Sequence, residues 1–424
     1  MEEDLKYLKE SPIIVRVKRR LTAAVEKASE RQKYESAHNP ELIKALKVVE
    51  HFLKVKKRVC YGGTAMNAIL PPSKQFYNPE LDLPDYDFFT PEMEEDIEDL
   101  VALLRKSGFT EIYHKVGIHE GTKKILVNFT PIADITYISK PIFNVLLKRS
   151  IVRKGVHHTD PEILRMMMYL ELSRPKGQVA RWEKVYERLK LINTVFPPRK
   201  SLGHTRKQTG RVNYAVLPAD MKAAVFDYCI EKQRSIFTGN LDSFYKRVIE
   251  AKSNTPVFDI RDFKGPLGFI TSDVRGDTKA IQELLGGSSI ANVLLHPAKG
   301  EIVPTYVEIS YNGLPAFLLL EETACHSYLS FPVVGGRSIS ICSLDTLITI
   351  YYSLAIFTGT ARRYISNIES RINKLVELTE RNRLYKNPNI PSFPISCHGY
   401  QKGFSTLLRE KIGRIAKEKA GGIE

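Results

Sequence analysis

The chain has 424 residues, more than the roughly 100 to 200 that one domain usually holds, so we expect two or three domains. Hydrophobic residues make up 43% of the chain and charged residues 26%, a composition that excludes a wholly disordered protein. The formal net charge of +15 favours nucleic acid as a partner, because each phosphate that a protein neutralises releases condensed counterions. The alternative is that the excess charge serves only solubility.

The five cysteines are widely spaced and include no Cys-x-x-Cys pair, so the sequence indicates neither a disulfide framework nor a zinc site. Met1 is followed by acidic residues instead of a basic and then apolar run, and no stretch approaches the roughly 18 apolar residues of a membrane span. We therefore expect a cytosolic protein in a reducing compartment, with no membrane partner.

The first half predicts helices around a mixed sheet. Residues 17–57 are expected to be helical, with Asn39 as an N-cap before Pro40. Further along we expect a strand at 59–61, a glycine turn and short helix at 62–70, a strand at 86–89, a helix at 92–107, and strands at 112–116, 124–129 and 132–138. A helix capped by Asp160 and a basic helix at 180–193 follow, which completes an α+β pattern.

A domain boundary is expected near residue 200, in the proline- and glycine-containing segment 197–203. The chain then consists of an N-terminal helical segment (1–57), a first α+β domain (58–200) and a second α+β domain (201–424). In the second domain, Asn312-Gly313 between two apolar runs is the strongest short hairpin signal, and Ser343 is expected to cap a helix. The stretch 411–419 predicts a basic C-terminal helix.

Asp85 and Asp87 stand two residues apart beside aromatic residues that favour a strand. On a strand such residues point to one face, where two carboxylates can bind hard divalent cations through oxygen. Two such ions would activate an attacking hydroxyl and stabilise a leaving pyrophosphate, as nucleotidyl transfer requires. An isolated Asp-x-Asp is weak evidence, because most such pairs lie in solvated turns or caps.

Gly62-Gly63-Thr64 lies upstream of the aspartates at the expected start of a helix. Two glycines let the backbone approach an anion and present amide groups to a phosphate. The alternative is a tight strand-to-helix turn that needs a positive φ at Gly62 or Gly63. Asn67, one helical turn later, could bond a ribose hydroxyl or a triphosphate oxygen, or could be a buried structural amide.

Asp134 lies at the centre of the apolar segment 132–137, which predicts a strand. Burying an unpaired carboxylate is costly, so an aspartate there indicates a metal or a charged partner. A structural salt bridge is the alternative. Together with Asp85 and Asp87 it gives the three carboxylates that normally complete a two-metal site.

Three segments carry a family resemblance, residues 61–67, 83–91 and 132–137. With 164–169, 172–175 and 181–185 they resemble the poly(A) polymerase catalytic subunits of large nucleocytoplasmic DNA viruses. The African swine fever virus and mimivirus types are similar, and the poxvirus type more distantly so. The resemblance covers residues 55–200 well and thins beyond them.

The resemblance implies a polymerase-β-like nucleotidyltransferase domain that adds AMP from ATP to the 3′ hydroxyl of mRNA without a template, using Mg²⁺ or Mn²⁺. By motif position, the catalytic metal ligands are Asp85, Asp87 and Asp134, and the nucleotide contacts are Gly62, Gly63, Thr64 and Asn67. At Asn67 the family is less uniform, since other members carry an acid near that point. The resemblance also implies a homodimer, and a location in the viral factory of the host cytoplasm and in the virion.

The second half is similar to a degenerate copy of the nucleotidyltransferase fold. Gly286-Gly287-Ser288 offers a second glycine turn, but no Asp-x-Asp comes after it. Around residues 338–358, a strand, Leu-Asp and an apolar helix are similar to the elements that come after the sheet in such a fold. We expect this half to be inactive in catalysis.

Two other functions stay open at this point: a nucleotidyltransferase of the toxin type that adds few nucleotides to tRNA, and a non-catalytic RNA-binding subunit. The basic residues Arg199, Lys200, His204, Arg206, Lys207 and Arg211 could follow an RNA backbone or form a solvated loop. His157-His158 before Asp160 is expected to be a capped loop rather than a metal cluster, because adjacent side chains diverge on any regular element.

Overall fold

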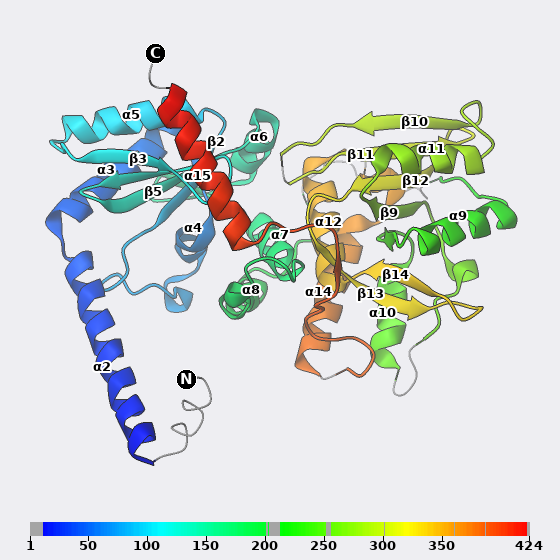
Figure 1. Cartoon of the computed structure of the whole chain (residues 1–424), viewed down its shortest axis with the longest axis horizontal. Helices are drawn as coiled ribbons and strands as arrows, with labels where there is room; N and C mark the ends of the chain where they lie inside the picture. Colours follow the sequence, from blue (N-terminus) through cyan, green and yellow to red (C-terminus); the bar gives the residue numbers. More distant parts are fainter. Residues whose placement is uncertain are drawn as a thin grey trace. The chain divides into compact units, whose positions relative to one another are not determined.

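The computed structural model describes residues 12–200, 202, 213–251, 256–300, 302–359, 361–385 and 387–421 (Figure 1). They form two compact units, each with its own sheet. Unit 1 contains the residues up to Tyr137 together with Ser150–Thr159, and unit 2 contains Ile138–Arg149 and the residues from Asp160 onward. The domain limits expected from the sequence, at residues 57 and 200, stay predictions. Most of the basic linker that we singled out, from His204 to Arg211, lies outside the described residues.

Unit 1 is built on a mixed seven-stranded sheet. In spatial order the strands are β3 (Ile112–Val116), β4 (Thr122–Val127), β5 (Thr130–Tyr137), β2 (Tyr86–Thr90), β1 (Val59–Cys60), β7 (Val156–His158) and β6 (Ile151–Arg153). The pairs β2–β5 and β1–β7 are parallel, and the other neighbours are antiparallel. The expected strands are confirmed; the β6–β7 hairpin replaces the loop that we expected at His157-His158.

The helices of unit 1 are α2 (Pro12–Ala37), α3 (Pro40–Lys56), α4 (Gly62–Ile69) and α5 (Met93–Lys106). The helical segment expected at residues 17–57 is confirmed, as two helices that separate at His38 and Asn39. The Asn39 Oδ1 accepts hydrogen bonds from the amides of Glu41 and Leu42, so the predicted N-cap is confirmed and starts a new helix.

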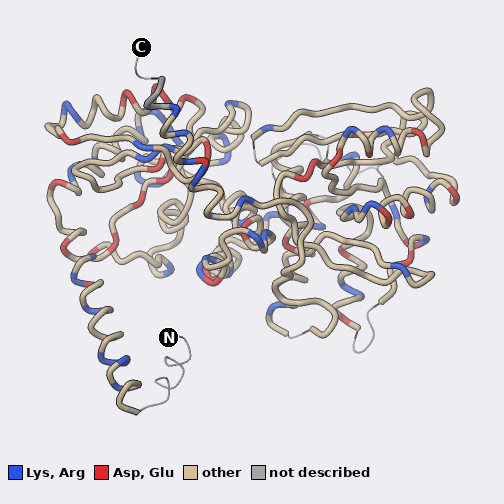
Figure 2. Tube along the Cα trace, in the orientation of Figure 1, with Lys and Arg blue, Asp and Glu red and all other residues tan. Residues whose placement is uncertain are grey.

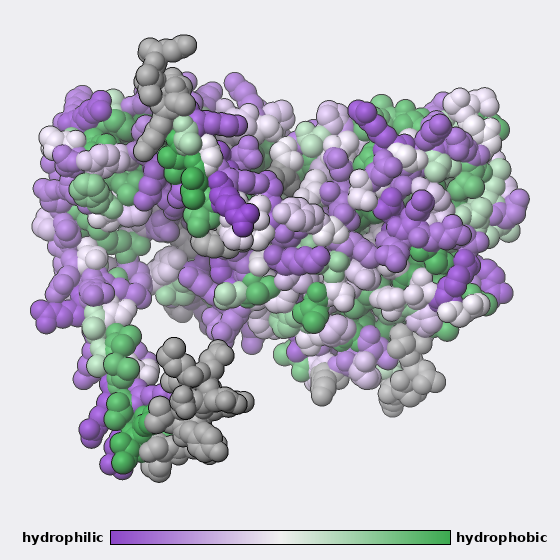
Figure 3. Space-filling model, in the orientation of Figure 1, coloured by the Kyte–Doolittle hydropathy of each residue, from purple (hydrophilic) through white to green (hydrophobic). Residues whose placement is uncertain are grey.

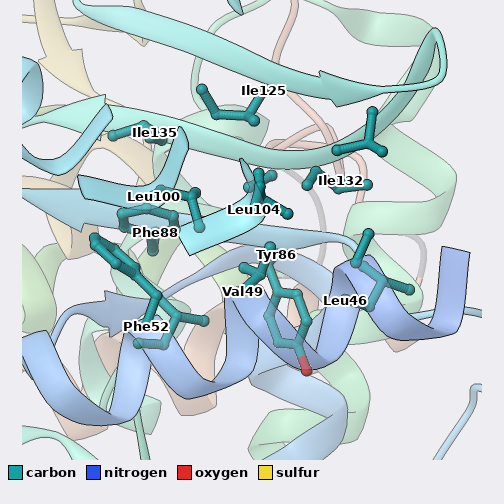
Figure 4. Close-up of a cluster of buried hydrophobic side chains, with 14 of the residues drawn as sticks. Leu46, Val49, Phe52, Tyr86, Phe88, Leu100, Leu104, Ile125, Ile132 and Ile135 are labelled. Carbon is teal, nitrogen blue, oxygen red and sulfur yellow. The ribbon is translucent and has the colours of Figure 1, made fainter. Parts of the chain in front are cut away.

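The core of unit 1 lies between its sheet and the helices α3 and α5 (Figure 4). Leu46, Val49 and Phe52 of α3 face Tyr86 and Phe88 of β2, and each buried side chain of this kind contributes roughly 1.5–3 kcal/mol. Since neighbouring side chains on a strand point to opposite faces, burying Tyr86 and Phe88 turns the residue between them to the face away from this core.

Helix α2 exposes nearly all of its side chains. Its lysines and arginines (Figure 2) are interspersed with exposed apolar residues such as Leu21 and Val25 (Figure 3). Over the described chain as a whole, basic residues are spread through both units rather than gathered in one segment (Figure 2). No helix among the described residues is both long and apolar enough to cross a membrane.

Unit 2 contains a mixed eight-stranded sheet. Its order is β10 (Ala291–His296), β11 (Tyr306–Tyr311), β12 (Leu314–Glu321), β9 (Leu267–Thr271), β8 (Ser235–Ile236), β14 (Ser338–Cys342), β13 (His326–Pro332) and β15 (Cys397–His398). Its longer helices are α6 (Lys140–Arg149), α7 (Pro161–Leu172), α8 (Trp182–Val195), α9 (Ala219–Glu231), α10 (Leu241–Glu250), α11 (Val274–Leu284), α12 (Leu344–Phe357), α14 (Ile368–Leu384) and α15 (Phe404–Gly421). Helix α12 is buried along its whole length.

Local signals in unit 2 are confirmed where they are strong. Asn312 and Gly313 both have a positive φ, 49° and 74°, as a two-residue hairpin turn requires. The Ser343 Oγ accepts the amide of Thr346 and so caps α12. Asp160 caps α7 by accepting the amide of Glu162. An α+β fold with two mixed sheets is therefore confirmed.

The two sheets share one topology. The order β3-β4-β5-β2-β1-β7-β6 in unit 1 matches β10-β11-β12-β9-β8-β14-β13 in unit 2, with the same parallel and antiparallel neighbours. Two details repeat with it. Arg58 forms a two-pronged ion pair with the buried Asp96, and Arg234 does the same with Asp277. The residue before each arginine has a φ near +50°.

Removing one partner of the buried Arg58–Asp96 pair should destabilise the protein by about 3–5 kcal/mol, because the other charge stays buried. The change is Arg58→Ala, and the measurement is urea unfolding followed by circular dichroism. Arg31→Ala is the control: it breaks an exposed ion pair with Glu35 and should leave the unfolding midpoint unchanged. Equal, small effects of both changes would contradict this assignment.

Candidate active site

Asp87 and Asp134 lie directly opposite each other on the parallel strands β2 and β5. The next pair in the register, Phe88 and Ile135, belongs to the core, so the two carboxylates share the opposite face of the sheet. The sequence predicted both residues as site residues, and the structure brings them together through a pairing that no local pattern specifies.

Gly62 lies against the carboxylate of Asp87. Its φ is +72°, and a Cβ added to it would be 2.6 Å from the Asp87 Oδ2. The backbone amide of Tyr61 donates to the Asp87 carbonyl at 2.9 Å, and this hydrogen bond fixes the glycine turn beside Asp87 of β2. Helix α4 begins at Gly62, so the glycine is needed both for its positive φ and for the close approach of Asp87.

Asp85 is exposed and precedes β2, which begins at Tyr86. Its backbone amide donates to the Thr64 Oγ1 at 3.0 Å, and its carbonyl accepts the amide of Asp87 at 3.1 Å. The expectation that one regular strand carries both aspartates is therefore wrong for Asp85, which lies one residue before β2. Thr64 anchors the segment of Asp85 to the start of α4, a contact that no pattern in the sequence predicts.

The Asn67 Oδ1 accepts the amides of Phe76 and Tyr77, at 2.8 and 3.1 Å. These bonds secure the loop that leads from α4 toward Asp85. They correspond to the structural-amide alternative that the sequence left open, and contact of Asn67 with a nucleotide stays a prediction.

Lys124 of β4 forms an ion pair with Asp134. The register places Lys124, Asp134 and Asp87 in one row across three strands. The sequence assigned no role to this lysine, because it lies in an expected strand and only the pairing of β4 with β5 shows its partner. The structural salt bridge, which was the alternative explanation for an aspartate at position 134, is thus present, and the carboxylate of Asp87 lies beside it.

Tyr61 adds a second row of polar groups to this face. Its hydroxyl lies 2.9 Å from the Thr136 Oγ1, which lies 3.1 Å from the Thr122 Oγ1. The Tyr61 ring stacks on Phe89 with centroids 4.0 Å apart. Burial raises the pKa of the Tyr61 phenol, and the charge of Asp87 raises it further, so the hydroxyl stays protonated at neutral pH.

Among the described residues, no three His, Cys, Asp or Glu side chains are gathered closely enough to hold a metal ion. The donors nevertheless suit a divalent cation, since carboxylate oxygens are the ligands that Mg²⁺ and Mn²⁺ prefer. The Asp134 Oδ1 is buried and has no hydrogen-bond partner in the described part of the chain. Asp87 and Asp134 would hold such an ion together, and Asp85 would join them from its exposed segment.

The equivalent place in unit 2 lacks these groups. The shared register puts Thr238, Gly268 and Leu318 where unit 1 has Gly62, Asp87 and Asp134. The amide of Phe237 donates to the Gly268 carbonyl at 2.9 Å, as that of Tyr61 does to Asp87. Gly286-Gly287 is not the equivalent turn, because it follows the end of α11; that expectation is corrected.

A glycine turn at a helix start, next to paired carboxylates on neighbouring strands, offers the anion-binding amides and the metal-binding oxygens that nucleotidyl transfer uses. Residues 47–178, which include all the site residues predicted in unit 1, match the family model of the poly(A) polymerase catalytic subunit. Over this segment the chain is similar to that family, and the resemblance stated from the sequence is confirmed.

Curated relatives agree with this family. A poly(A) polymerase catalytic subunit of Acanthamoeba polyphaga mimivirus is 30% identical over 158 residues, 36% of this chain and 26% of that protein. One of African swine fever virus (strain Badajoz 1971 Vero-adapted) is 30% identical over 167 residues, 38% of this chain and 35% of that protein. The matched part of the chain thus spans about a third or less of these relatives.

A solved structure extends the likeness in fold beyond this segment. The Megavirus polyadenylate synthase matches with a TM-score of 0.72, over 97% of this chain and 84% of that one, at 19% identity. At this identity the match shows that the fold is shared.

Gly62→Ala should destabilise the protein by more than Gly313→Ala does. Both glycines have nearly the same φ, +72° and +74°, so alanine incurs a similar backbone strain of about 1–3 kcal/mol at either position. At Gly313 the new methyl group meets nothing within 4 Å, whereas at Gly62 it meets Asp87. Urea unfolding of the two variants measures the difference. Equal losses of stability in the two variants would show that the Asp87 side chain moves away from the added methyl group without a cost in free energy.

Proposed function

We propose that this chain is a template-independent polynucleotide adenylyltransferase that adds AMP from ATP to the 3′ hydroxyl of mRNA. The observation that supports it most is the pair Asp87 and Asp134, opposite each other on parallel strands beside the Gly62 turn. The family match over residues 47–178 supports the same activity.

In the proposed reaction the 3′ oxygen of the RNA attacks the α-phosphorus of ATP. The bond from that phosphorus to the bridging oxygen of the β-phosphate breaks, pyrophosphate leaves, and the hydroxyl proton passes to solvent. Bound Mg²⁺ or Mn²⁺ supplies activation of the hydroxyl and neutralisation of the leaving group. Asp85, Asp87 and Asp134 hold the metal, and the backbone at Gly62 and Gly63 receives the triphosphate.

Thr64 and Lys124 have positioning roles in this scheme. Thr64 holds the backbone of Asp85 through its hydroxyl. Lys124 neutralises Asp134 while no metal is bound, since burial of an unpaired carboxylate is costly. The preference for adenylate rests on the family likeness alone.

Catalysis is assigned to residues 58–200, and the second half is assigned the role of an inactive relative of the nucleotidyltransferase domain. The shared strand order and the repeated Arg–Asp pair support this relationship. The residues at the positions of Asp87 and Asp134 are Gly268 and Leu318, which offer no carboxylate. A homodimer and a place in the viral factory of the host cytoplasm belong to the same proposal and derive from the family.

The experiment is extension of a labelled RNA primer with each of the four nucleoside triphosphates separately, in Mg²⁺ and in Mn²⁺. Long products from ATP are the expected result. Addition of one or a few nucleotides would instead indicate the toxin-type enzyme. If no RNA is extended under any condition, the protein is not a polymerase of this kind.

Asp87→Asn and Asp134→Asn should each reduce primer extension by roughly a thousandfold or more, because a lost metal ligand costs several kcal/mol of transition-state stabilisation. Glu120→Gln, which removes an exposed carboxylate of unit 1, should leave the rate unchanged. Initial rates in the primer-extension assay measure both. Extension by either aspartate variant at the rate of the control would exclude that residue from the site.

A further inference from the structure

A pocket of about 230 Å³ lies in unit 2, and its lining does not include Thr238, Gly268 or Leu318. It is lined by the segment before β8, by the end of β9 and by the paired strands β13 and β15. Among its lining residues are Lys232, Gln233, Arg234, Glu322, His326 and His398. The walls are mostly polar and basic, so a charged ligand suits this pocket better than an apolar one.

The positive charge of the pocket is not balanced. Arg234 is satisfied by Asp277, with bonds of 2.7 and 3.0 Å. Lys232 is exposed and forms no ion pair with any residue that the structure describes. Lys176, which acts electrostatically on Glu322 and His398, forms none among the described residues either. Glu322 is the one carboxylate among the pocket's described lining residues, and Lys176 and Arg234 act on it electrostatically.

The equivalent segment of unit 1 shows which acidic groups are absent beside Lys232. Lys56 occupies the position of Lys232, two residues before the arginine of the buried pair, and it binds Glu95 and Asp99 at 2.9 and 2.5 Å. Counted from the paired aspartates Asp96 and Asp277, the residues of unit 2 at these two places are Gly276 and Ala280. Unit 2 therefore has the lysine without either of the two acidic partners that Lys56 has.

Two histidines supply hydrogen-bonding groups on another wall. His326 and His398 are opposite each other in the pairing of β13 with β15. Burial lowers the pKa of His326 to about 3, with a further contribution from Arg174. Burial also lowers the pKa of His398, and Arg234 and Lys176 lower it further. Both imidazoles are neutral at pH 7, and nearby cations create a positive potential around them.

An exposed aromatic ring comes directly after the pocket in the chain. Gly399 lines the pocket, and the next residue, Tyr400, is 69% exposed. Unpaired cations beside an exposed aromatic ring are the combination with which proteins bind single-stranded nucleic acid, the cations receiving phosphates and the ring stacking on a base.

We propose that this pocket binds a backbone phosphate of single-stranded RNA, with an adjacent base stacked on Tyr400. The proposal rests on RNA being the substrate, and it adds to the catalytic residues of unit 1 an RNA contact in unit 2. Lys232 and Lys176 pair with the phosphate, and His326 and His398 donate hydrogen bonds through their ring nitrogens.

The test is the binding of a fluorescein-labelled oligoadenylate to the full chain, followed by anisotropy in EDTA so that no extension occurs. Lys232→Ala should weaken binding about tenfold, as loss of a charged hydrogen bond does. Ala280→Asp should weaken it similarly by giving Lys232 the acid that Lys56 has, whereas Ala280→Asn should not. Tyr400→Ala should weaken binding about fivefold or more.

The control for general charge is Lys279→Ala, since Lys279 is exposed on α11 of the same unit and should change affinity less than about twofold. The slope of log affinity against log salt should fall by about 0.7 in Lys232→Ala and stay constant in the control. Equal effects of Lys232→Ala and Lys279→Ala, or of Ala280→Asp and Ala280→Asn, would overturn the proposal.

Competition distinguishes the possible sources of the anion. Unlabelled oligoadenylate should displace the probe at much lower concentration than pyrophosphate or an oligoglutamate peptide. Displacement by pyrophosphate at an equal concentration would assign the pocket to free phosphates, and displacement by the peptide to an acidic protein. Either result overturns the RNA assignment.

The pocket assignment and the enzymatic proposal can fail separately. If primer extension proceeds while the pocket variants bind RNA normally, only the pocket assignment fails. If RNA binds at the pocket and is not extended, only the enzymatic proposal fails.

Discussion

The parallel pairing of β2 with β5 is the constraint on which the rest of unit 1 depends. It places Phe88 and Ile135 in the core beneath α3 and α5, and by the same alternation it places Asp87 and Asp134 on the other face. A shift of one residue would exchange the two sets, exposing aromatic surface and burying carboxylates. Stability and the geometry of the site are therefore set by one register, and the hydrophobic core keeps the aspartates in place.

The second unit shows which parts of this arrangement belong to the framework and which to the site. The buried arginine–aspartate pair, the strand order and the left-handed residue before the arginine occur in both units. The carboxylates do not. A buried ion pair that loses one partner is costly, so it persists where the fold persists. The partly exposed carboxylate of Asp87 is not under the same constraint.

Much of the site could be predicted from the sequence because its signals are local. Asp134 is conspicuous as an acid in an apolar strand, and Gly62 as part of a glycine pair before a helix. Lys124 could not be predicted, since its partner is known only from the pairing of β4 with β5. The same limit explains the misplaced glycine turn at Gly286: composition marks a turn, whereas only topology shows which turn corresponds to Gly62. The fold class could be predicted from the order of strands and helices, but the seven-strand order common to both sheets could not.

The larger and the smaller side chain have exchanged positions between the two units, since Thr238 is at the position of Gly62 and Gly268 at the position of Asp87. In unit 1 the small residue is on the turn and the large one on the strand, and in unit 2 the threonine is on the turn, with its methyl group 2.4 Å from where a Cβ of Gly268 would lie. An aspartate placed at Gly268 alone would overpack this contact, and a glycine placed at Thr238 alone would remove the hydroxyl that accepts the Gly268 amide. Each single change toward the arrangement of unit 1 is therefore unfavourable, so packing couples the identities of Thr238 and Gly268.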